Sequence, residues 1–578
     1  MYDITSPWII DTPLSDRWPV YTRANIEDVS ATVTSPLMWT MIGGPPAERE
    51  WKKALAEFGA FDLEEFRDEL IDIQGMVHGY IYLNLSNMRT FGARMPNASP
   101  EMMDRAYLGI AEAPPYVPHP DDYKPQYTER ILATVQRVLG ETERPDLDDF
   151  RGEAAALRAS RPDLTTMSDS ELIARERQIM AEVYPAFLRT HLRIVYEVGV
   201  VSGALDEKVA SLGEPELAIR LISGLGDIAS AAPSEAIWQL GRKVRDDEVL
   251  TAEFDAGPDN LEGRLRASDA PAARTFLKEF DQFLYDFGSR SADEWAAMPK
   301  TWETHPKIAI GLIGRMRLQD DHKQPSRNSA RLRTEREELM AEIRGRLADD
   351  ADALAGFNAI LASAELYSRS REQSKTNTIR VLHEARLPIW ELANRYVTRG
   401  ILARPEDLTM LREDELDSFV ADPLRWVPII EERLKWYDEL SALEPPFLID
   451  GSIPPVSTWP EKITPDLDPA VSGTVLSGIA ACAGTATGTA RIITDPDQAD
   501  DLQPGEILVA PLTDPGWTPL FTSAAAVVVD TGMPMAHAAI VSRELGIPCV
   551  LGVRGASKKI TEGATLTVDG AAGTVRVH

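Results

Sequence analysis

A histidine near the carboxyl end of the chain stands where phosphate chemistry is favoured. His537 follows a strand-like run and a glycine and proline turn, and it opens a helix pattern that ends at Gly546, with Pro548 two residues later. The start of a helix offers free backbone N–H groups and the positive end of the helix dipole, and both attract anions. A neutral imidazole there can attack phosphorus through one ring nitrogen while a hydrogen bond holds the other. The pattern predicts a covalent phosphohistidine; the structural alternative is a capping or packed histidine.

Positive charge that could steady a phosphoryl group lies earlier in the chain. Arg371 and Lys375 are four residues apart, so a helix would place both on one face. The chain has 60 basic and 91 acidic residues and a formal net charge of −31, so such a pair is a local exception. It could cradle a transferring phosphoryl group, and the lysine could help to deprotonate an acceptor hydroxyl. The alternative is a solvated helix face with the same spacing.

Four more residues are candidates for substrate binding, each with a structural alternative. His383 continues the helix face of Lys375 in four-residue steps, but a satisfied histidine on a mixed face is the commoner case. Arg290 and Glu294 are also four apart, which favours a structural salt bridge ahead of a catalytic role. His191, in FLRTHLRIVYEVG, completes the set, with core packing as its alternative.

Two parts of the chain with different patterns must position these residues. A capping box at Ser168 and Glu171 predicts the start of one helix. Apolar positions recur at helical spacing over 47–74, 127–140, 169–212, 214–248, 270–287 and 328–403. After 470, short β-branched runs alternate with glycine, proline and one helix-like segment. We expect a multidomain α+β protein with a mostly α-helical substrate domain (1–443), a proline-rich linker (444–470) and a small β/β/α module (471–578).

Composition narrows the classes of function. A chain of 578 residues, 44% of them hydrophobic, can bury several cores. The acidic balance would repel nucleic acid and anionic membranes. Two cysteines cannot form a disulfide framework or a cysteine-rich zinc site, the amino-terminal residues lack a signal-peptide pattern, and no stretch approaches about 18 apolar residues. We expect a cytoplasmic protein with no metal site, nucleic-acid partner or membrane contact.

The carboxyl-terminal module resembles the swivelling phosphohistidine domain of the PEP-utilising enzymes. TGMPMAHAAIVSRELGIPCVLG (531–552) is similar to their phosphohistidine signature, and 478–493 and 507–517 resemble the glycine-rich opening and the middle strand of that domain. The sequence departs from the family at Ala536, where Ser, Thr or Cys is common, and at Met533, where the family has a paired glycine. The resemblance implies a mobile carrier whose phosphoryl group is bonded to His537.

The preceding region resembles the substrate domain of rifampin phosphotransferase and the large subunit of phenylphosphate synthase. Landmarks of that domain lie at 17–39, 79–88, 283–295 and 400–411. The resemblance implies functional roles for Arg371 and Lys375, with Ser374 in the place of a family proline, and His191 matches a histidine often seen there. The substrate-domain pattern has begun by residue 17, and the first 450 residues contain no glycine-rich phosphate loop with a lysine. We therefore expect the family's ATP-grasp domain on a separate polypeptide.

The resemblance implies a subunit of a dikinase-type phosphotransferase. A separate ATP-grasp subunit, similar to the amino-terminal part of PEP synthase, would bind ATP and Mg²⁺ and charge His537, with release of AMP and phosphate. This chain would hold no cofactor tightly and would pass the phosphoryl group to the hydroxyl of a small aromatic or phenolic compound. The alternatives are a component that phosphorylates a rifamycin-type antibiotic and a non-catalytic regulatory subunit.

Overall fold

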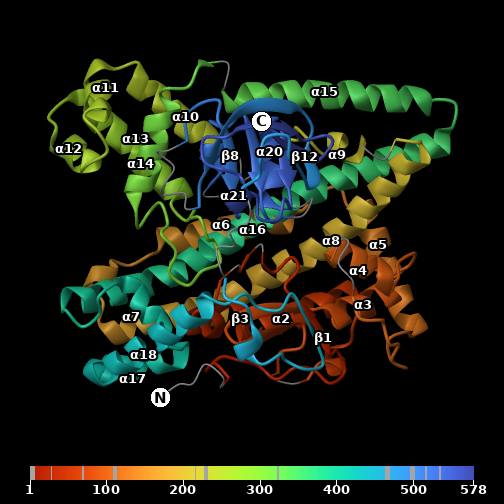
Figure 1. Cartoon of the computed structure of the whole chain (residues 1–578), viewed down its shortest axis with the longest axis horizontal. Coiled ribbons are helices and arrows are strands. Elements are labelled where there is room, and N and C mark those ends of the chain that lie inside the picture. The colour runs from red at the N-terminus through yellow and green to blue at the C-terminus, as the bar shows by residue number, and fades with distance from the viewer. Residues whose placement is uncertain are drawn as a thin grey trace. The chain divides into compact units, whose positions relative to one another are not determined.

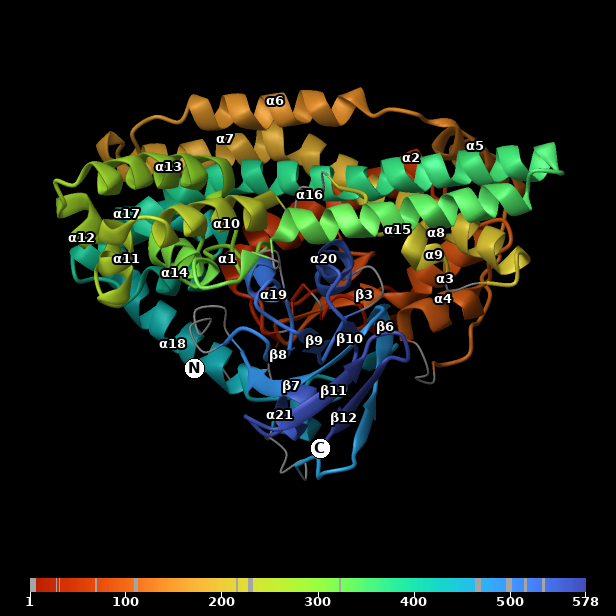
Figure 2. The ribbon, with the colours of Figure 1, turned by 90° about the horizontal axis from the view of Figure 1, so that it is seen from above.

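The computed structural model divides into two compact units. Unit 1 comprises Met1–Leu205, Trp295–Met298 and Ala362–Ile463, and unit 2 comprises Asp206–Glu294, Pro299–Leu361 and Thr464–His578. Figures 1 and 2 show the elements of both. The structure describes residues 7–27, 29–30, 32–67, 70–108, 113–214, 217–226, 232–321, 324–462, 469–494, 502–513, 517–532 and 536–578.

Unit 1 is mostly helical, as the sequence predicts. Its helices are α1 (Pro36–Met38), α2 (Pro45–Phe58), α3 (Leu85–Arg94), α4 (Pro100–Leu108), α5 (Pro125–Gly140), α6 (Pro145–Ala159), α7 (Asp169–Gln178), most of α8 (Tyr184–Ser211) and of α16 (Ala351–Thr398), α17 (Leu416–Ala421) and α18 (Pro423–Ser441). The capping box predicted at Ser168 and Glu171 forms, and α7 begins directly after it. A π-helical turn, Ile179–Val183, joins α7 to α8.

One predicted helix is wrong over much of its length. The pattern over 47–74 predicts a helix, but α2 ends at Phe58 because Gly59 adopts a left-handed conformation, with φ of 94°. The apolar residues that follow, among them Phe61 and Phe66, pack beside Trp18 in a small core instead of continuing the helix.

A four-stranded antiparallel sheet, absent from the sequence prediction, lies within unit 1. Its strands run in the order β2 (Gln74–Val77), β3 (Tyr80–Asn84), β1 (Val20–Thr22) and β4 (Leu448–Asp450). Strand β4 belongs to the stretch predicted as a linker, and Trp459 from the same stretch is buried against Tyr80. The described part of 444–462 is thus packed on unit 1, and residues 463–468 lie outside the described residues.

The core of unit 1 that matters for function lies between α7, α8 and α16. Buried residues of α8, such as Phe187 and Leu188, belong to one apolar cluster with Ile379, Leu382 and their neighbours on α16. A polar contact also joins the two helices: Thr378 Oγ1 on α16 donates to the carbonyl of Ser374, 2.8 Å away, and lies 3.3 Å from the carbonyl of Phe187 on α8. The side chains of α8 near Phe187 therefore contact those of α16 near Thr378.

Glu176 on α7 gives the first prediction, a change in the pH dependence of stability. Its side chain is buried and its Oε2 has no hydrogen-bond partner. Burial raises the pKa of this carboxyl to about 8, with a further rise from Glu413. The folded state therefore holds a proton that the unfolded chain releases above its ordinary value of 4.5, so stability falls as the pH rises from about 4.5 to 8.

In Glu176→Gln this part of the pH dependence disappears. We expect the difference in unfolding free energy between pH 5 and pH 8 to shrink by roughly 1–3 kcal/mol, measured by urea unfolding at both pH values. The matched control is Glu182→Gln, because Glu182 is exposed on the adjoining π-helical turn. Equal pH profiles for wild type and Glu176→Gln would contradict the assignment.

Unit 2 joins a group of helices to the carboxyl-terminal module. Its helices are α9 (Leu217–Leu221), α10 (Ala232–Arg245), α11 (Glu248–Asp255), α12 (Leu261–Ala267), α13 (Pro271–Phe287), α14 (Pro306–Met316), α15 (Pro325–Arg346) and, in the module, α19 (Thr518–Phe521), α20 (His537–Leu545) and α21 (Ala556–Lys559). One apolar core runs from α10, α13 and α14 into the module, where it includes Phe521 and Ala539.

The module is built on an eight-stranded mixed sheet. The strand order is β5 (Val475–Ser477), β12 (Thr574–Val577), β11 (Thr565–Asp569), β7 (Thr485–Ile492), β8 (Ile507–Ala510), β9 (Ala526–Val529), β10 (Cys549–Leu551) and β6 (Ile479–Cys482). Strands β7 to β10 are parallel and the outer strands are antiparallel. Helix α20 contacts β6, β9 and β10 on one side and α15 on the other (Figure 2). This is the predicted β/β/α module.

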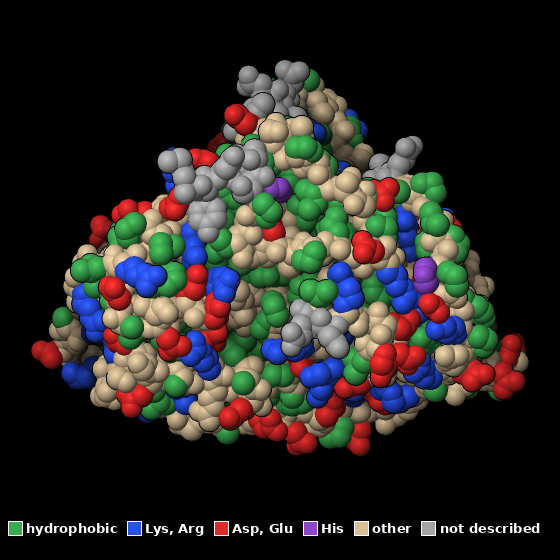
Figure 3. Space-filling model, turned by 90° about the horizontal axis from the view of Figure 1, so that it is seen from below, with side chains coloured by type: hydrophobic (Ala, Val, Ile, Leu, Met, Phe, Trp, Pro, Cys, Tyr) green, Lys and Arg blue, Asp and Glu red, His purple; other side chains and the backbone are tan. Residues whose placement is uncertain are grey.

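The face of the molecule seen in Figure 3 carries no dominant patch of acidic or basic side chains. Acidic and basic side chains are interspersed across that face. Among the described residues, no helix combines the length and the apolar character needed to cross a membrane. Within the same residues there is no group of three or more His, Cys, Asp or Glu side chains arranged to hold a metal ion.

Candidate functional site

His537 lies at the start of α20, as the sequence predicts. The residue before it, Ala536, is the extended amino-terminal cap, and the helix ends at Gly546 in the left-handed conformation. The helix is fixed to the sheet because its buried face includes Ala538, Ala539 and Val541. The imidazole itself is half-buried, so the ring is held but accessible. The position therefore combines a helix amino terminus with a nucleophile that another molecule can reach.

Two threonine hydroxyls flank the imidazole of His537. Thr518 Oγ1, at the start of α19, lies 3.0 Å from Nε2, and Thr513 Oγ1 lies 3.5 Å from Nδ1. The ring of Phe521 meets the imidazole edge-on, with centroids 5.9 Å apart. Sequence reasoning noted that Ala536 lacks the hydroxyl common before the histidine, but it missed these two. The hydroxyl of Thr518 can orient the ring before transfer and donate to a phosphoryl oxygen after it.

Removal of the Thr518 hydroxyl gives the second prediction. In Thr518→Val the ring loses one hydrogen bond at nearly constant side-chain shape, so we expect phosphorylation of His537 to slow by about 5- to 10-fold, the value of one hydrogen bond. The measurement is the initial rate at which potassium phosphoramidate, a chemical phosphoryl donor, labels the full chain. Thr487→Val is the control, because it removes a hydroxyl from an exposed strand position of the same module. Wild-type rates in Thr518→Val would show that the contact does not position the ring.

Arg371 and Lys375 lie in unit 1, on α16, and the structure brings both close to His191 of α8. Both cations lower the pKa of His191, although burial of the ring is the larger cause, and together they bring it to about 3. The Arg371 side chain is 23% exposed, its nearest acid is Glu372 at 3.9 Å, and its Nη1 is sealed from solvent without a hydrogen-bond acceptor. A guanidinium N–H in that state favours an added anion as its partner.

Ser374 joins the two helices at this point. Its Oγ lies 3.0 Å from His191 Nδ1 and 3.0 Å from the carbonyl of Arg371, to which it donates. The indole of Trp295 stacks beside the imidazole, with ring centroids 6.1 Å apart. Residues Arg371, Ser374, Lys375, His191 and Trp295 thus form one cluster within unit 1, which we call the cationic cluster. Sequence reasoning singled out Arg371, Lys375 and His191 but gave no role to Ser374.

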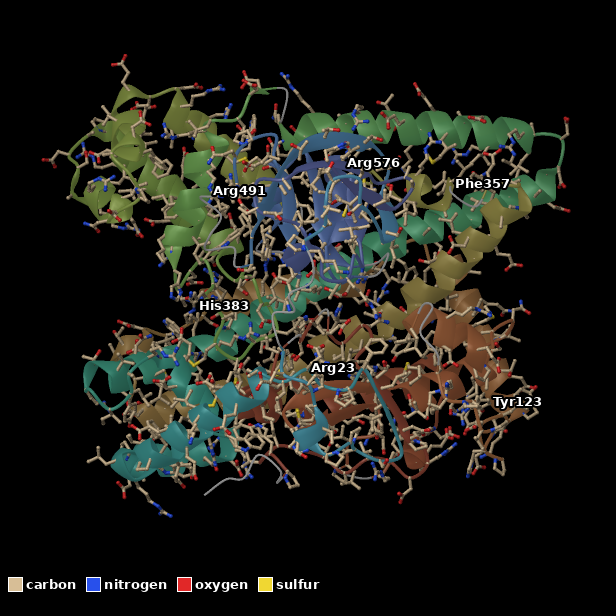
Figure 4. The ribbon with its side chains drawn as sticks, viewed as in Figure 1. Arg23, Tyr123, Phe357, His383, Arg491 and Arg576 are labelled. Carbon is tan, nitrogen blue, oxygen red and sulfur yellow. The ribbon has the colours of Figure 1, made fainter. Side chains whose placement is uncertain are left out.

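The remaining predicted site residues lie elsewhere. Arg290 and Glu294, in unit 2, form the predicted ion pair, with 2.9 Å between Arg290 Nη1 and Glu294 Oε1, and both side chains are buried. His383 lies on α16, beyond Lys375 along the helix, and is buried in unit 1 (Figure 4). The geometry of Arg290 and Glu294 fits their structural alternative, and the part of all three residues in substrate binding stays a prediction.

Comparison with known proteins places both parts of the chain. Residues 502–573, which include His537 and Thr518, match the family model of the mobile domain of PEP-utilising enzymes. The carboxyl-terminal module is thus similar to the mobile domain of the PEP-utilising enzymes. Residues 190–401, which include His191, Arg371 and Lys375, match the model of the rifampicin phosphotransferase fourth domain. His537 and the cationic cluster therefore both fall inside matched regions.

Several curated proteins are similar to this chain. Prodigiosin synthesizing transferase PigC of Serratia marcescens is 24% identical over 604 residues, which cover 99% of this chain and 64% of PigC. Uncharacterized phosphotransferase YvkC of Bacillus subtilis is 26% identical over 69% of this chain and 48% of its own length. Rifampicin phosphotransferase of Streptomyces sviceus is 25% identical over 73% of this chain and 48% of its own length. The chain spans less than two thirds of each of these relatives.

Proposed function

We propose that this chain is the carrier and acceptor-binding part of a dikinase-type phosphotransferase, with His537 as the phosphoryl carrier. The observation that carries the proposal is the position of His537 at the start of α20, half-buried and flanked by the hydroxyls of Thr518 and Thr513. The nucleophile, the orienting hydroxyls and the helix amino terminus together are what a transient phosphohistidine needs. The match of 502–573 to the mobile domain of PEP-utilising enzymes supports this reading.

The cationic cluster is the proposed acceptor site. Phosphoryl transfer needs positive groups that bind the equatorial oxygens while the acceptor attacks in line. Arg371 offers an unsatisfied N–H, and Lys375 lies one turn further along the same helix. In a chain of net charge −31, two cations one helical turn apart support a phosphoryl site. Transfer would form an oxygen–phosphorus bond on the acceptor and break the phosphorus–nitrogen bond on His537.

The proposal also names a phosphoryl donor and an acceptor. We propose that an ATP-grasp subunit binds ATP and Mg²⁺ and charges His537, releasing AMP and phosphate, and that the acceptor is a small aromatic or phenolic alcohol. The relatives named rifampicin phosphotransferase favour a second acceptor class, a rifamycin-type antibiotic. The stacked Trp295 beside His191 is compatible with an aromatic acceptor in either class.

Labelling with ATP tests the function. The purified full chain is incubated with Mg²⁺ and [β-³²P]ATP, with and without a candidate ATP-grasp protein. We expect acid-labile, alkali-stable label on this chain only with the partner, and its transfer to phenol or to rifampicin then identifies the acceptor class. Label that appears without the partner would remove the two-subunit proposal. A chain that stays unlabelled by this route and by phosphoramidate would remove the carrier proposal.

A further inference from the structure

His191 is fixed at one ring nitrogen and open at the other. Its Nδ1 is hydrogen-bonded to Ser374 Oγ. Its Nε2 has no hydrogen-bond partner in the described residues, yet it is not among their solvent-sealed, unbonded side-chain atoms. The residue is 8% exposed, so this remaining exposure includes the Nε2 edge. A packed histidine would present a sealed or bonded edge, whereas this one presents a nitrogen that a small molecule can reach.

The hydrogen bonds of Ser374 select the tautomer of His191. The hydroxyl proton is directed at the carbonyl of Arg371, so its oxygen accepts from Nδ1–H of the imidazole. The lone pair of the neutral ring then lies on Nε2. The charged groups that act on the ring are Arg371 and Lys375, both from α16, and both disfavour a positive imidazole. Without a bound anion the imidazole of His191 is therefore neutral and only weakly basic.

We propose that His191 is the general base of the transfer step: its Nε2 takes the proton of the acceptor hydroxyl, and the phosphoryl group held by Arg371 and Lys375 makes it basic enough to do so. The inference rests on the proposed function and deepens it. The negative phosphoryl oxygens offset the two cations, so the electrostatic cost of a positive imidazole falls when the charged carrier is in place. The base is thereby active when there is a phosphoryl group to transfer and weak otherwise.

The step balances with the phosphohistidine ring protonated on its second nitrogen. The acceptor oxygen attacks phosphorus, its proton passes to His191 Nε2, and the phosphorus–nitrogen electron pair returns to His537. His537 leaves as a neutral imidazole, the product is a phosphate monoester, and His191 becomes an imidazolium. Its proton then passes to solvent through the accessible Nε2 edge. No oxidant or reductant takes part.

Lys375 is the rival base, because a lysine on the same helix face could take the acceptor proton instead. A lysine beside Arg371 and a phosphoryl group serves the transfer as a cation, and it would have to lose its own proton before it could act as a base. His191 is neutral already. The two possibilities differ in their pH profiles, since a base at His191 titrates well below the range of a lysine.

Nuclear magnetic resonance tests the electrostatic part without any transfer. The full chain, labelled with ¹⁵N in histidine and in arginine, is titrated from pH 5 to pH 9, with and without inorganic phosphate, and the His191 and Arg371 signals are assigned from His191→Asn and Arg371→Ala. Without phosphate we expect neutral His191 throughout. With saturating phosphate we expect His191 to become protonated within this pH range, and in Arg371→Ala a smaller fraction of it should be protonated at each pH. Phosphate that shifts the Arg371 Nε–H signal but leaves His191 unchanged overturns the inference. Absence of any effect at either residue removes the proposed phosphoryl site itself.

Discharge of the charged carrier tests the catalytic part. The full chain is charged with phosphoramidate, freed of reagent, and mixed with phenol as the probe, and formation of phenyl phosphate is followed across the pH range. In His191→Asn we expect the rate to fall about 100-fold, a usual share for general-base catalysis, and to lose its pH dependence near neutrality, with charging of His537 unchanged. In Ser374→Ala the rate of phenyl phosphate formation should fall by a smaller factor. His119→Asn is the control, because that ring is exposed in unit 1.

A structural role for His191 predicts a different outcome. The rate would then fall equally at every pH, and the thermal stability of the variant would fall with it. A full wild-type rate in His191→Asn would also overturn the inference, while leaving the carrier role of His537 intact. Failure of the wild-type chain to form phenyl phosphate, with phenol and with rifampicin alike, would instead count against the proposed function.

Discussion

Replacement of His537 by asparagine is expected to abolish acid-labile labelling of the chain and to reduce phosphoryl transfer by at least about 10,000-fold, as loss of a covalent nucleophile does in other enzymes. Asparagine is close to histidine in size and can still be reached by the hydroxyl of Thr518, so α20 should form as before. What disappears is the ring nitrogen that bonds to phosphorus. The measurement is incorporation of ³²P from ATP with the partner, or from phosphoramidate without it.

The matched control for this variant is another histidine of the same module. His578 is exposed at the end of the chain and contacts only the Thr567 hydroxyl among the interactions of its side chain in the described residues. His578→Asn should label at the wild-type rate. Full acid-labile label in His537→Asn would place the phosphoryl group on some other residue and would end the carrier proposal.

Arg371→Ala is expected to separate charging from delivery. The guanidinium is proposed to bind the phosphoryl oxygens in the transition state, and removal of one such donor costs about 100- to 1,000-fold in rate. Labelling of His537 should stay at the wild-type level, because Arg371 belongs to unit 1 and the groups that hold the imidazole belong to unit 2. Single-turnover discharge of the labelled chain to phenol and to rifampicin measures the loss.

Two further variants sharpen this test. Arg371→Lys keeps the charge but loses the planar pair of donors, so it should recover only part of the rate if the phosphoryl contact is bidentate. Lys435→Ala removes a highly exposed cation from α18 in the same unit, and it should discharge normally. An Arg371→Ala chain that discharges at the wild-type rate would show that the cationic cluster is not the acceptor site.

The sequence alone predicts much of the carrier module because its signals are local. The Gly546 and Pro548 pair marks the end of α20, β-branched runs mark the strands, and the phosphohistidine signature is contiguous. Thr518 shows where this reasoning ends. Its hydroxyl meets His537 across 19 residues of chain, through the packing of α19 beside α20, and no periodicity records that approach.

The same limit explains the parts of unit 1 that the sequence does not predict. The strands β1 and β4 are three residues each and pair across most of the chain, so they carry no alternating pattern long enough to read. The contact of Ser374 with His191 spans 183 residues. From the sequence, Ser374 is a replaced proline on a helix face, and only the packing of α16 on α8 gives its hydroxyl a partner.

The apolar core that α19 and α20 share with α10, α13 and α14 has a consequence for motion. If the carrier moved without α10, α13 and α14, the shared apolar surface would be exposed to water. The free-energy cost would be about 25 cal/mol for each Å² of apolar surface exposed. A carrier that moved together with α10, α13 and α14 would keep this interface buried, but a much larger body would then have to diffuse through the solvent. The rate of each turnover would then depend less on the reactivity of the imidazole than on how fast this apolar interface opens and forms again.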